Sequence, residues 1–308
     1  MALTPEIQAF LTGIEAANFP PVWEAPLQVS RANTQGRVAL AGAPESILKV
    51  ENRYIAGPTS DLHIRIYTPT NNTSAPALVY FHGGGWVQNF IDMYDAPLHR
   101  IANQSGAVVI AVNYQKAPEH PYPAPFNDCF ATLEWVIKNA QSLGVDPRKI
   151  GVGGDSAGGN IAAGVALKAR DLHIDLAFQI LVYPCIERDF TASSYQDFAT
   201  GYALTTQATE WFWDQYLQTH EFDNDPYACP GKATSLNNVA PAVVLNAQYD
   251  PIVSDGIKYV ELLKRDGVDV QARIFEGMVH GFFGIMAVTP MSKVALDYCA
   301  ENIKRLTQ

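Results

Sequence analysis

The chain has 308 residues, of which 48% are hydrophobic and 17% charged, and its formal net charge at pH 7 is −10. This length and composition suit a compact globular protein of one large or two smaller domains, and they argue against intrinsic disorder. An acidic surface repels phosphate backbones and anionic lipid, so we expect no nucleic-acid partner and no membrane partner.

The N-terminal segment MALTPEIQAFLTGIEAANFPP lacks a basic region followed by a long apolar stretch. It therefore predicts a short amphipathic helix and not a signal peptide. No apolar run elsewhere reaches the roughly 18 residues of a membrane span. The four cysteines include no CxxC pair, which suits a reducing compartment, and we expect a cytoplasmic protein. Cys129 lies on an apolar helix face, which predicts a buried thiol.

From residue 47 onward the pattern is that of strands. Apolar and polar residues alternate, as in half-exposed strands, in ILKVENRYIAG and LHIRIYTP. Solid apolar runs, which suit strands covered on both faces, follow in ALVYFHG, AVVIAVNY, KIGVGG, AFQILVYP and AVVLNAQ, and a final strand in VQARIFEG. Helix patterns separate these runs, among them PFNDCFATLEWVIKNA, SDGIKYVELLKRDG and residues 291–306. The alternation predicts an α/β fold with a mainly parallel sheet and right-handed crossovers.

One segment, from about residue 186 to 222, interrupts this alternation and contains no strand pattern. Its helix ATEWFWDQYL has one apolar face, and Trp211 and Phe212 point away from that face. One interpretation is a helix buried against the body of the protein. The other is a cap that holds aromatic side chains over an active site. The two overlap, because a cap must also pack.

The stretch IGVGGDSAGGN, residues 150–160, places a serine between glycines where a strand pattern gives way to a helix pattern. Gly154, Ser156 and Gly158 fit the G-x-S-x-G pattern of a nucleophile elbow. A serine hydroxyl is a weak nucleophile, so it must stand exposed on a sharp turn and be served by a base. Ala157 opens the next helix, which leaves its backbone N–H free at the positive end of the helix dipole. Small residues recur at many strand–helix turns, so the pentapeptide alone leaves catalytic and structural roles open.

A second glycine-rich stretch, FHGGGW, follows the strand pattern at residues 77–81. Three successive glycines form either a flexible turn or a loop that presents consecutive N–H groups to an anion. A loop after this earlier strand is where the second part of an oxyanion hole is expected beside a nucleophile elbow. We expect His82 to anchor that loop, because a general base would need a partner acid within reach.

Two further residues complete a possible catalytic set. Asp250 directly follows the strand AVVLNAQY, and His280 follows the strand VQARIFEG. By itself, Asp250 also suits the cap of a helix that begins near Pro251, and a lone loop histidine is commonplace. Together with Ser156, however, they occur in the chain order Ser…Asp…His of a catalytic triad on a nucleophile elbow. The joint occurrence in this order favours a hydrolase site.

The chain resembles the hormone-sensitive-lipase-like family of carboxylesterases, in its bacterial GDSAG-type branch, in the motifs HGGGW, APEHPYPAP, GDSAGGN, DPIVSDG and HGF. The likeness extends over nearly the whole chain. It implies an α/β-hydrolase fold, with a mostly parallel eight-stranded sheet flanked by helices and a helical cap. The implied arrangement is one unit, 1–308, with the cap from 1–45 and 186–222 and the catalytic core from 46–185 and 223–308.

The resemblance also implies the members of the site. Ser156 is expected as nucleophile, His280 as general base and then acid, and Asp250 as the residue that orients His280. The oxyanion hole is expected to consist of the backbone N–H groups of Gly84, Gly85 and Ala157. Gly83 is the loop glycine that is left out. This chemistry needs no metal and no organic cofactor. The expected partner is a small-molecule ester, and a homodimer is one expected state because the family often forms dimers.

The sequence departs from the family pattern in two places. After NY the family usually has an Arg-Leu pair, whereas Gln115 and Lys116 stand here, which leaves open what replaces the packing or ion pair of the arginine. After DP a second acidic pair is common, whereas Ser254 replaces one member here and Asp255 remains. Asp255 is then either a reserve acid or, as we favour, a capping or supporting residue.

These features predict a carboxylic ester hydrolase that acts on short- to medium-chain acyl esters by a Ser-His-Asp acyl-enzyme mechanism. An amidase or lactonase with the same triad stays open, because the chemistry is shared. A non-catalytic small-molecule receptor on this fold is expected to lack a triad member, and all three residues are present here. A true lipase is disfavoured, because the cap segment contains no large amphipathic lid.

Overall fold

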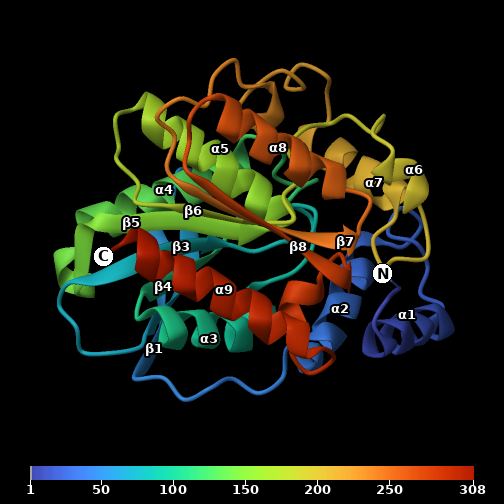
Figure 1. Ribbon diagram of the computed structural model, residues 1–308, viewed down its shortest axis with the longest axis horizontal. Coiled ribbons are helices and arrows are strands. Elements are labelled where there is room, and N and C mark those ends of the chain that lie inside the picture. Colours follow the sequence, from blue (N-terminus) through green and yellow to red (C-terminus); the bar gives the residue numbers. More distant parts are fainter. Residues whose placement is uncertain (1) are drawn as a thin grey trace.

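The computed structural model describes residues 2–308 and shows a central sheet with helices on both faces (Figure 1). Among these residues, eight strands form one sheet in the order β1-β2-β4-β3-β5-β6-β7-β8. The strands are β1 (Lys49–Ala56), β2 (Asp61–Thr68), β3 (Ala75–Phe81), β4 (Val108–Asn113), β5 (Val145–Asp155), β6 (Gln179–Val182), β7 (Ala242–Tyr249) and β8 (Val270–Val279). Strand β2 pairs antiparallel with β1 and β4, and all the other pairs are parallel. The sheet confirms the predicted mostly parallel, eight-stranded α/β fold.

Helices cover both faces of this sheet, which explains why the central strands are solid apolar runs. One face carries α3 (Asp95–Ser105) and α9 (Pro290–Leu306), and the other carries α4 (Ala124–Lys138), α5 (Ala157–Asp171) and α8 (Val253–Arg265) (Figure 1). Nearly every residue of β3 and β4 is buried as a result. No helix among residues 2–308 combines the length and apolar character needed to cross a membrane.

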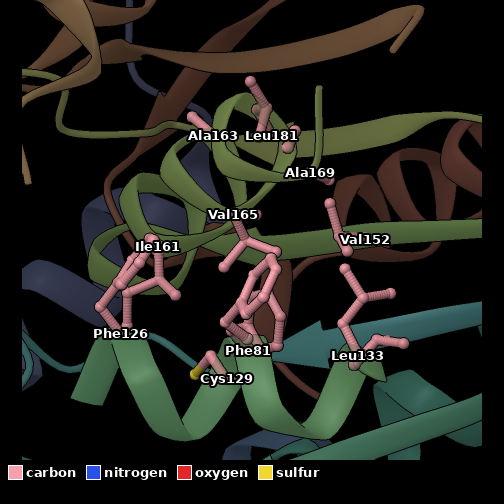
Figure 2. Packing of buried hydrophobic residues seen from close by; sticks show 14 of the residues in the cluster. Phe81, Phe126, Cys129, Leu133, Val152, Ile161, Ala163, Val165, Ala169 and Leu181 are labelled. Atoms are coloured by element: carbon pink, nitrogen blue, oxygen red, sulfur yellow. The ribbon is translucent and has the colours of Figure 1, made fainter. Parts of the chain in front are cut away.

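The hydrophobic core on the α4 and α5 side is tightly filled. Figure 2 shows Phe81 at the end of β3 between Cys129 of α4 and Val165 of α5, and all three side chains are fully buried. Cys129 is a free thiol, as predicted. Packing of this kind fixes the carboxyl ends of the strands relative to one another, and that edge of the sheet is where the candidate site residues follow their strands.

The segments predicted as a cap gather at the carboxyl ends of the strands (Figure 1). Their elements are α1 (Pro5–Ala17), α2 (Leu27–Gln35), η1 (Gly36–Ala41), α6 (Ser194–Asp197) and α7 (Thr206–Leu217). The remaining short turns are η2 (Ile91–Tyr94), η3 (Gln141–Leu143), η4 (Pro230–Lys232) and η5 (Phe282–Gly284).

Helix α7 rests on the core through its apolar face. Trp213, Tyr216 and Leu217 are buried, whereas Trp211 and Phe212 are only partly buried, which is the division that the sequence predicts. The ring of Tyr216 stacks on Trp86 at a centroid distance of 4.3 Å and an interplanar angle of 1°. The helix therefore packs on the core and still leaves other aromatic side chains free to face elsewhere.

Candidate active site

Ser156 stands on the sharp turn between β5 and α5. Its backbone has φ 55° and ψ −122°, a conformation that non-glycine residues rarely adopt and that stores strain at functional sites. A Cβ atom on Gly154 would lie 2.4 Å from the carbonyl oxygen of Gly158, and a Cβ on Gly158 would lie 2.0 Å from that of Phe81. Only glycine fits at either position, which is the physical reason for the glycines around the serine.

The structure brings Ser156, His280 and Asp250 together although 124 residues separate the first pair and 30 the second. His280 Nε2 lies 2.9 Å from Ser156 Oγ, and His280 Nδ1 lies 2.7 Å from Asp250 Oδ2. Asp250 is fully buried, and its Oδ1 accepts a hydrogen bond of 3.0 Å from the N–H of Ile252. With Nδ1–H donating to Asp250, the lone pair of Nε2 faces the serine hydroxyl, so the imidazole can accept a proton from it.

Asp155, the residue directly before the serine in the G-x-S-x-G pattern, connects the two halves of the site. Its Oδ1 accepts hydrogen bonds from the Tyr80 hydroxyl at 2.8 Å and the Gly83 N–H at 2.9 Å. Its Oδ2 accepts one from the Tyr94 hydroxyl at 3.1 Å. Burial raises the pKa of this carboxyl, and the three donors act against that rise. The acid thereby ties the serine turn to the glycine-rich loop, and the only sequence signal for it is an acid among glycines.

The same contacts decide which backbone N–H groups remain free near the serine. The Gly83 N–H is already used by Asp155 and by the Tyr94 hydroxyl at 3.0 Å. Across residues 2–308 no acceptor contacts the three N–H groups that the resemblance implies for the oxyanion hole, those of Gly84, Gly85 and Ala157. Gly84 and Gly85 have φ 116° and 59° and line the same cavity as Ser156. These donors are therefore available to an oxygen that becomes negative beside the serine.

His82 holds the glycine-rich loop, as predicted. Its Nδ1 lies 2.8 Å from the Gly83 carbonyl oxygen, and its ring stacks on Tyr114 at 4.4 Å. The Tyr114 hydroxyl donates a hydrogen bond of 2.6 Å to the His82 carbonyl oxygen. Burial lowers the pKa of His82 to about 3, so this ring stays neutral and keeps its anchoring contacts across the physiological pH range.

The two departures from the family pattern also have structural explanations. Gln115 donates from its side-chain amide to both oxygens of Asp128, at 3.2 and 3.3 Å, and from its backbone N–H at 2.9 Å, so a neutral amide holds the buried acid. Asp255 accepts hydrogen bonds from the Ile186 N–H and the Tyr195 hydroxyl, both at 3.0 Å. These contacts belong to a supporting residue that joins α8 to the segment before α7.

A cavity of about 220 Å³ opens above the serine. On the core side it is lined by Gly84, Gly85, Ser156, Tyr183 and His280. On the other side its apolar lining comes from the predicted cap, through Phe10, Ile14, Val22, Leu40, Leu204 and Phe212. The Phe212 ring lies so close to the loop that a Cβ on Gly85 would be 2.2 Å from it. Of the two aromatics that sequence analysis placed off the packing face of α7, Phe212 lines the cavity.

Comparisons with known proteins find relatives over most of the chain. A family model described as the alpha/beta hydrolase fold matches residues 78–284. The chain is 38% identical over 255 residues to Esterase LipI of Mycobacterium tuberculosis, covering 81% of this chain and 80% of the relative. It is 35% identical over 298 residues to Carboxylesterase NlhH of the same species, covering 93% and 92%. A thermostable esterase from Pseudomonas putida superposes with a TM-score of 0.95 at 31% identity, covering 100% of this chain and 98% of that one.

Proposed function

Because this chain belongs to the alpha/beta hydrolase fold family, in its hormone-sensitive-lipase-like branch of carboxylesterases, we propose that Ser156, His280 and Asp250 hydrolyse small carboxylic esters. The chain is a serine carboxylesterase, like the relatives that it matches over most of their length. One observation supports the assignment of roles above all others. It is the unbroken line of contacts from Asp250 Oδ2 through the imidazole of His280 to Ser156 Oγ.

The first half of the reaction forms a tetrahedral intermediate on Ser156. Neutral His280 takes the hydroxyl proton on Nε2 while Ser156 Oγ bonds to the carbonyl carbon of the ester, and the carbonyl electrons move onto its oxygen. The buried carboxylate of Asp250 stabilises the imidazolium that forms. The negative oxygen is held by the N–H groups of the glycine-rich loop and Ala157, and each such donor contributes about 3–4 kcal/mol in a related site.

The second half releases both products. The imidazolium of His280 gives its proton to the leaving alkoxide as the C–O bond to the alcohol breaks. A water molecule then attacks the acyl carbon while Nε2 accepts its proton. The bond to Ser156 breaks, and the proton on Nε2 returns to Oγ as the free acid departs. One atom, Nε2 of His280, carries the proton in every step.

The size of the cavity supports short- to medium-chain acyl esters as substrates. Its volume of about 220 Å³ is below the roughly 300–1,000 Å³ of pockets for drug-sized ligands. The Phe212 ring, pressed against the loop at Gly85, closes part of the remaining space. We propose that residues 1–45 and 186–222 act as the cap that sets this limit, over a catalytic core of residues 46–185 and 223–308.

A series of p-nitrophenyl esters from acetate to dodecanoate tests this function, measured on the wild type and on Ser156→Ala. The wild type should show its highest kcat/KM on a short or medium acyl chain. The variant should lose several orders of magnitude in kcat while its circular dichroism and unfolding temperature show a folded protein. A variant that keeps a tenth of the wild-type rate would refute the role of the serine, and a preference for long emulsified chains would refute the size limit.

A cytoplasmic location and a homodimeric state are further proposals, and both depend on the sequence features and the resemblance described above. Cell fractionation with an antibody against the native protein tests the location, and a membrane-bound or secreted pool would contradict it. Size-exclusion chromatography with light scattering tests the assembly, and a monomer at micromolar concentration would contradict a stable dimer.

A further inference from the structure

One cationic side chain in the cavity has no role in the mechanism above. Arg37 belongs to η1 and lines the cavity that also contains Ser156. Its segment packs against η2, which carries Tyr94. The Tyr94 hydroxyl in turn accepts the N–H of Gly83 in the glycine-rich loop. Arg37 thus shares the cavity with the reacting groups, and its segment packs on the turn whose Tyr94 holds the glycine-rich loop.

Arg37 has no partner in the protein. Within residues 2–308, no hydrogen bond and no ion pair involves its guanidinium. Arg31, on the preceding helix α2, is the opposite case, because it donates to the Val87 carbonyl oxygen at 2.9 Å and to both oxygens of Glu119 at 2.7 Å. Arg31 therefore ties the cap to the core, whereas Arg37 does not serve that purpose.

Arg37 combines a mostly apolar cavity with access to solvent. The cavity that Arg37 lines is mostly apolar, and its lining includes Phe10, Ile14, Leu40, Met93 and Ile285. An arginine remains charged in proteins. The carboxylate of Asp155, which also lines the cavity, is engaged by three other donors. Arg37 is exposed to solvent, so an anion from solution can reach it.

We propose that Arg37 binds a carboxylate group of the substrate, so that this enzyme prefers esters that also carry a carboxylate, such as monoesters of short dicarboxylic acids. The planar guanidinium matches a carboxylate with two parallel hydrogen bonds, and such charge-assisted pairs are the strong ones. The inference rests on the proposed ester hydrolysis at Ser156, and Arg37 takes no part in the making or breaking of bonds. The net charge of −10 repels anions at long range, so the preference must arise locally in the cavity.

Two matched substrate pairs test the proposal and distinguish the two sides of the ester. The acyl-side pair is mono-p-nitrophenyl glutarate and the p-nitrophenyl ester of glutaric acid monoamide. The alcohol-side pair is 4-acetoxybenzoate and 4-acetoxybenzamide. In each pair the charged member is compared with a neutral member of nearly the same shape, and the ratio of their kcat/KM values is measured for the wild type, Arg37→Met and Arg37→Lys.

Arg148→Met is the matched control for the loss of one positive charge. The Arg148 side chain is 86% exposed and pairs with Asp146 near the start of β5, whereas Ser156 follows the end of that strand. In at least one pair the wild type should favour the charged ester. Arg37→Met should lower the ratio by about tenfold or more, Arg37→Lys should lower it less, and Arg148→Met should leave it unchanged.

The outcomes separate this inference from the proposed function. Hydrolysis of both members of both pairs without preference for the charged ester would overturn the role of Arg37 and leave ester hydrolysis intact. Equal ratios in Arg37→Met and Arg148→Met would overturn it as well. Failure to hydrolyse any of the four esters would refute the proposed function itself. If Arg37→Met does not fold, the ratio of Arg37→Lys decides, and calorimetric titration of Ser156→Ala with monoethyl glutarate, with and without Arg37→Lys, measures the same preference as binding.

Discussion

Replacement of Asp155 by asparagine tests whether this buried acid positions the oxyanion loop. The carboxylate accepts hydrogen bonds from Tyr80, Gly83 and Tyr94. Asparagine keeps one acceptor oxygen and presents an NH₂ group where the second oxygen accepted the Tyr94 hydroxyl. We therefore expect the contact to Tyr94 to be lost and the contact to Gly83 to weaken, because a charge-assisted hydrogen bond becomes a neutral one.

The magnitude follows from those two changes. A hydrogen bond to a charged group contributes about 1.5–3 kcal/mol and a neutral one about 1 kcal/mol, so losing one such bond and weakening another should lower the free energy of unfolding of Asp155→Asn by about 2–5 kcal/mol. A small displacement of the loop N–H groups should lower kcat by roughly tenfold to a hundredfold, because oxyanion donors act on the transition state. KM should change little, since the ground-state carbonyl depends less on those donors.

The assay is steady-state hydrolysis of p-nitrophenyl butyrate, combined with urea unfolding of the same variant. Tyr80→Phe is the matched control, because it removes another hydrogen bond of Asp155 without touching the loop. That control should lose a comparable amount of stability and less of its kcat. A folded Asp155→Asn protein with kcat within twofold of the wild type would refute the positioning role, and so would equal losses of kcat in both variants.

Three further predictions concern the pH dependence and the shape of the site. Burial raises the pKa of Asp255 to about 8, above its ordinary value of 3.8, so the folded state keeps a proton that the unfolded chain releases. The wild type should therefore lose stability relative to Asp255→Asn as the pH rises between these two values, by about 1.4 kcal/mol per pH unit at most. Urea unfolding of both proteins at pH 6 and pH 8 measures the difference in their free energies of unfolding. A difference that does not change with pH would contradict the prediction. Phe212→Ala should shift the preferred acyl chain in the p-nitrophenyl series to greater length, because the ring is removed from the cavity; an unchanged profile would show that another side chain sets the limit. Activity on p-nitrophenyl butyrate should fall in acid, because protonated His280 cannot accept the serine proton, and a flat profile from pH 8 to pH 5 would count against the general base.

Local patterns in the sequence were sufficient to predict much of the fold. The solid apolar runs predicted the central strands, because strands covered by helices on both faces bury every side chain. Boundaries were less predictable. Strand β6 ends at Val182, inside the run AFQILVYP, because Tyr183 leaves the strand with φ 34° and its ring packs on His280 at 4.5 Å. Strand β5 begins at Val145, before the run KIGVGG, because that residue pairs with Ala75 of β3.

The candidate site also contains residues that the sequence could predict and residues that it could not. The glycines around Ser156 could be predicted because their cause is local, namely the close approach of strand and helix at one turn. The roles of Asp155 and Arg37 could not, since they depend on residues distant in the chain. Asp155 needs Tyr80 and Tyr94, and Arg37 lines the cavity from η1, which packs on η2. Neither residue belongs to a periodic pattern that would have distinguished it.

The central claim is that Ser156 forms a covalent intermediate with the aid of His280. Reaction of the protein with a p-nitrophenyl phosphonate, followed by peptide mass spectrometry, tests this claim most directly. We expect one label per chain, on the peptide that contains Ser156, together with a matching loss of esterase activity and little labelling of Ser156→Ala or His280→Asn. A label on a different residue, or full labelling of the Ser156→Ala protein, would contradict the account.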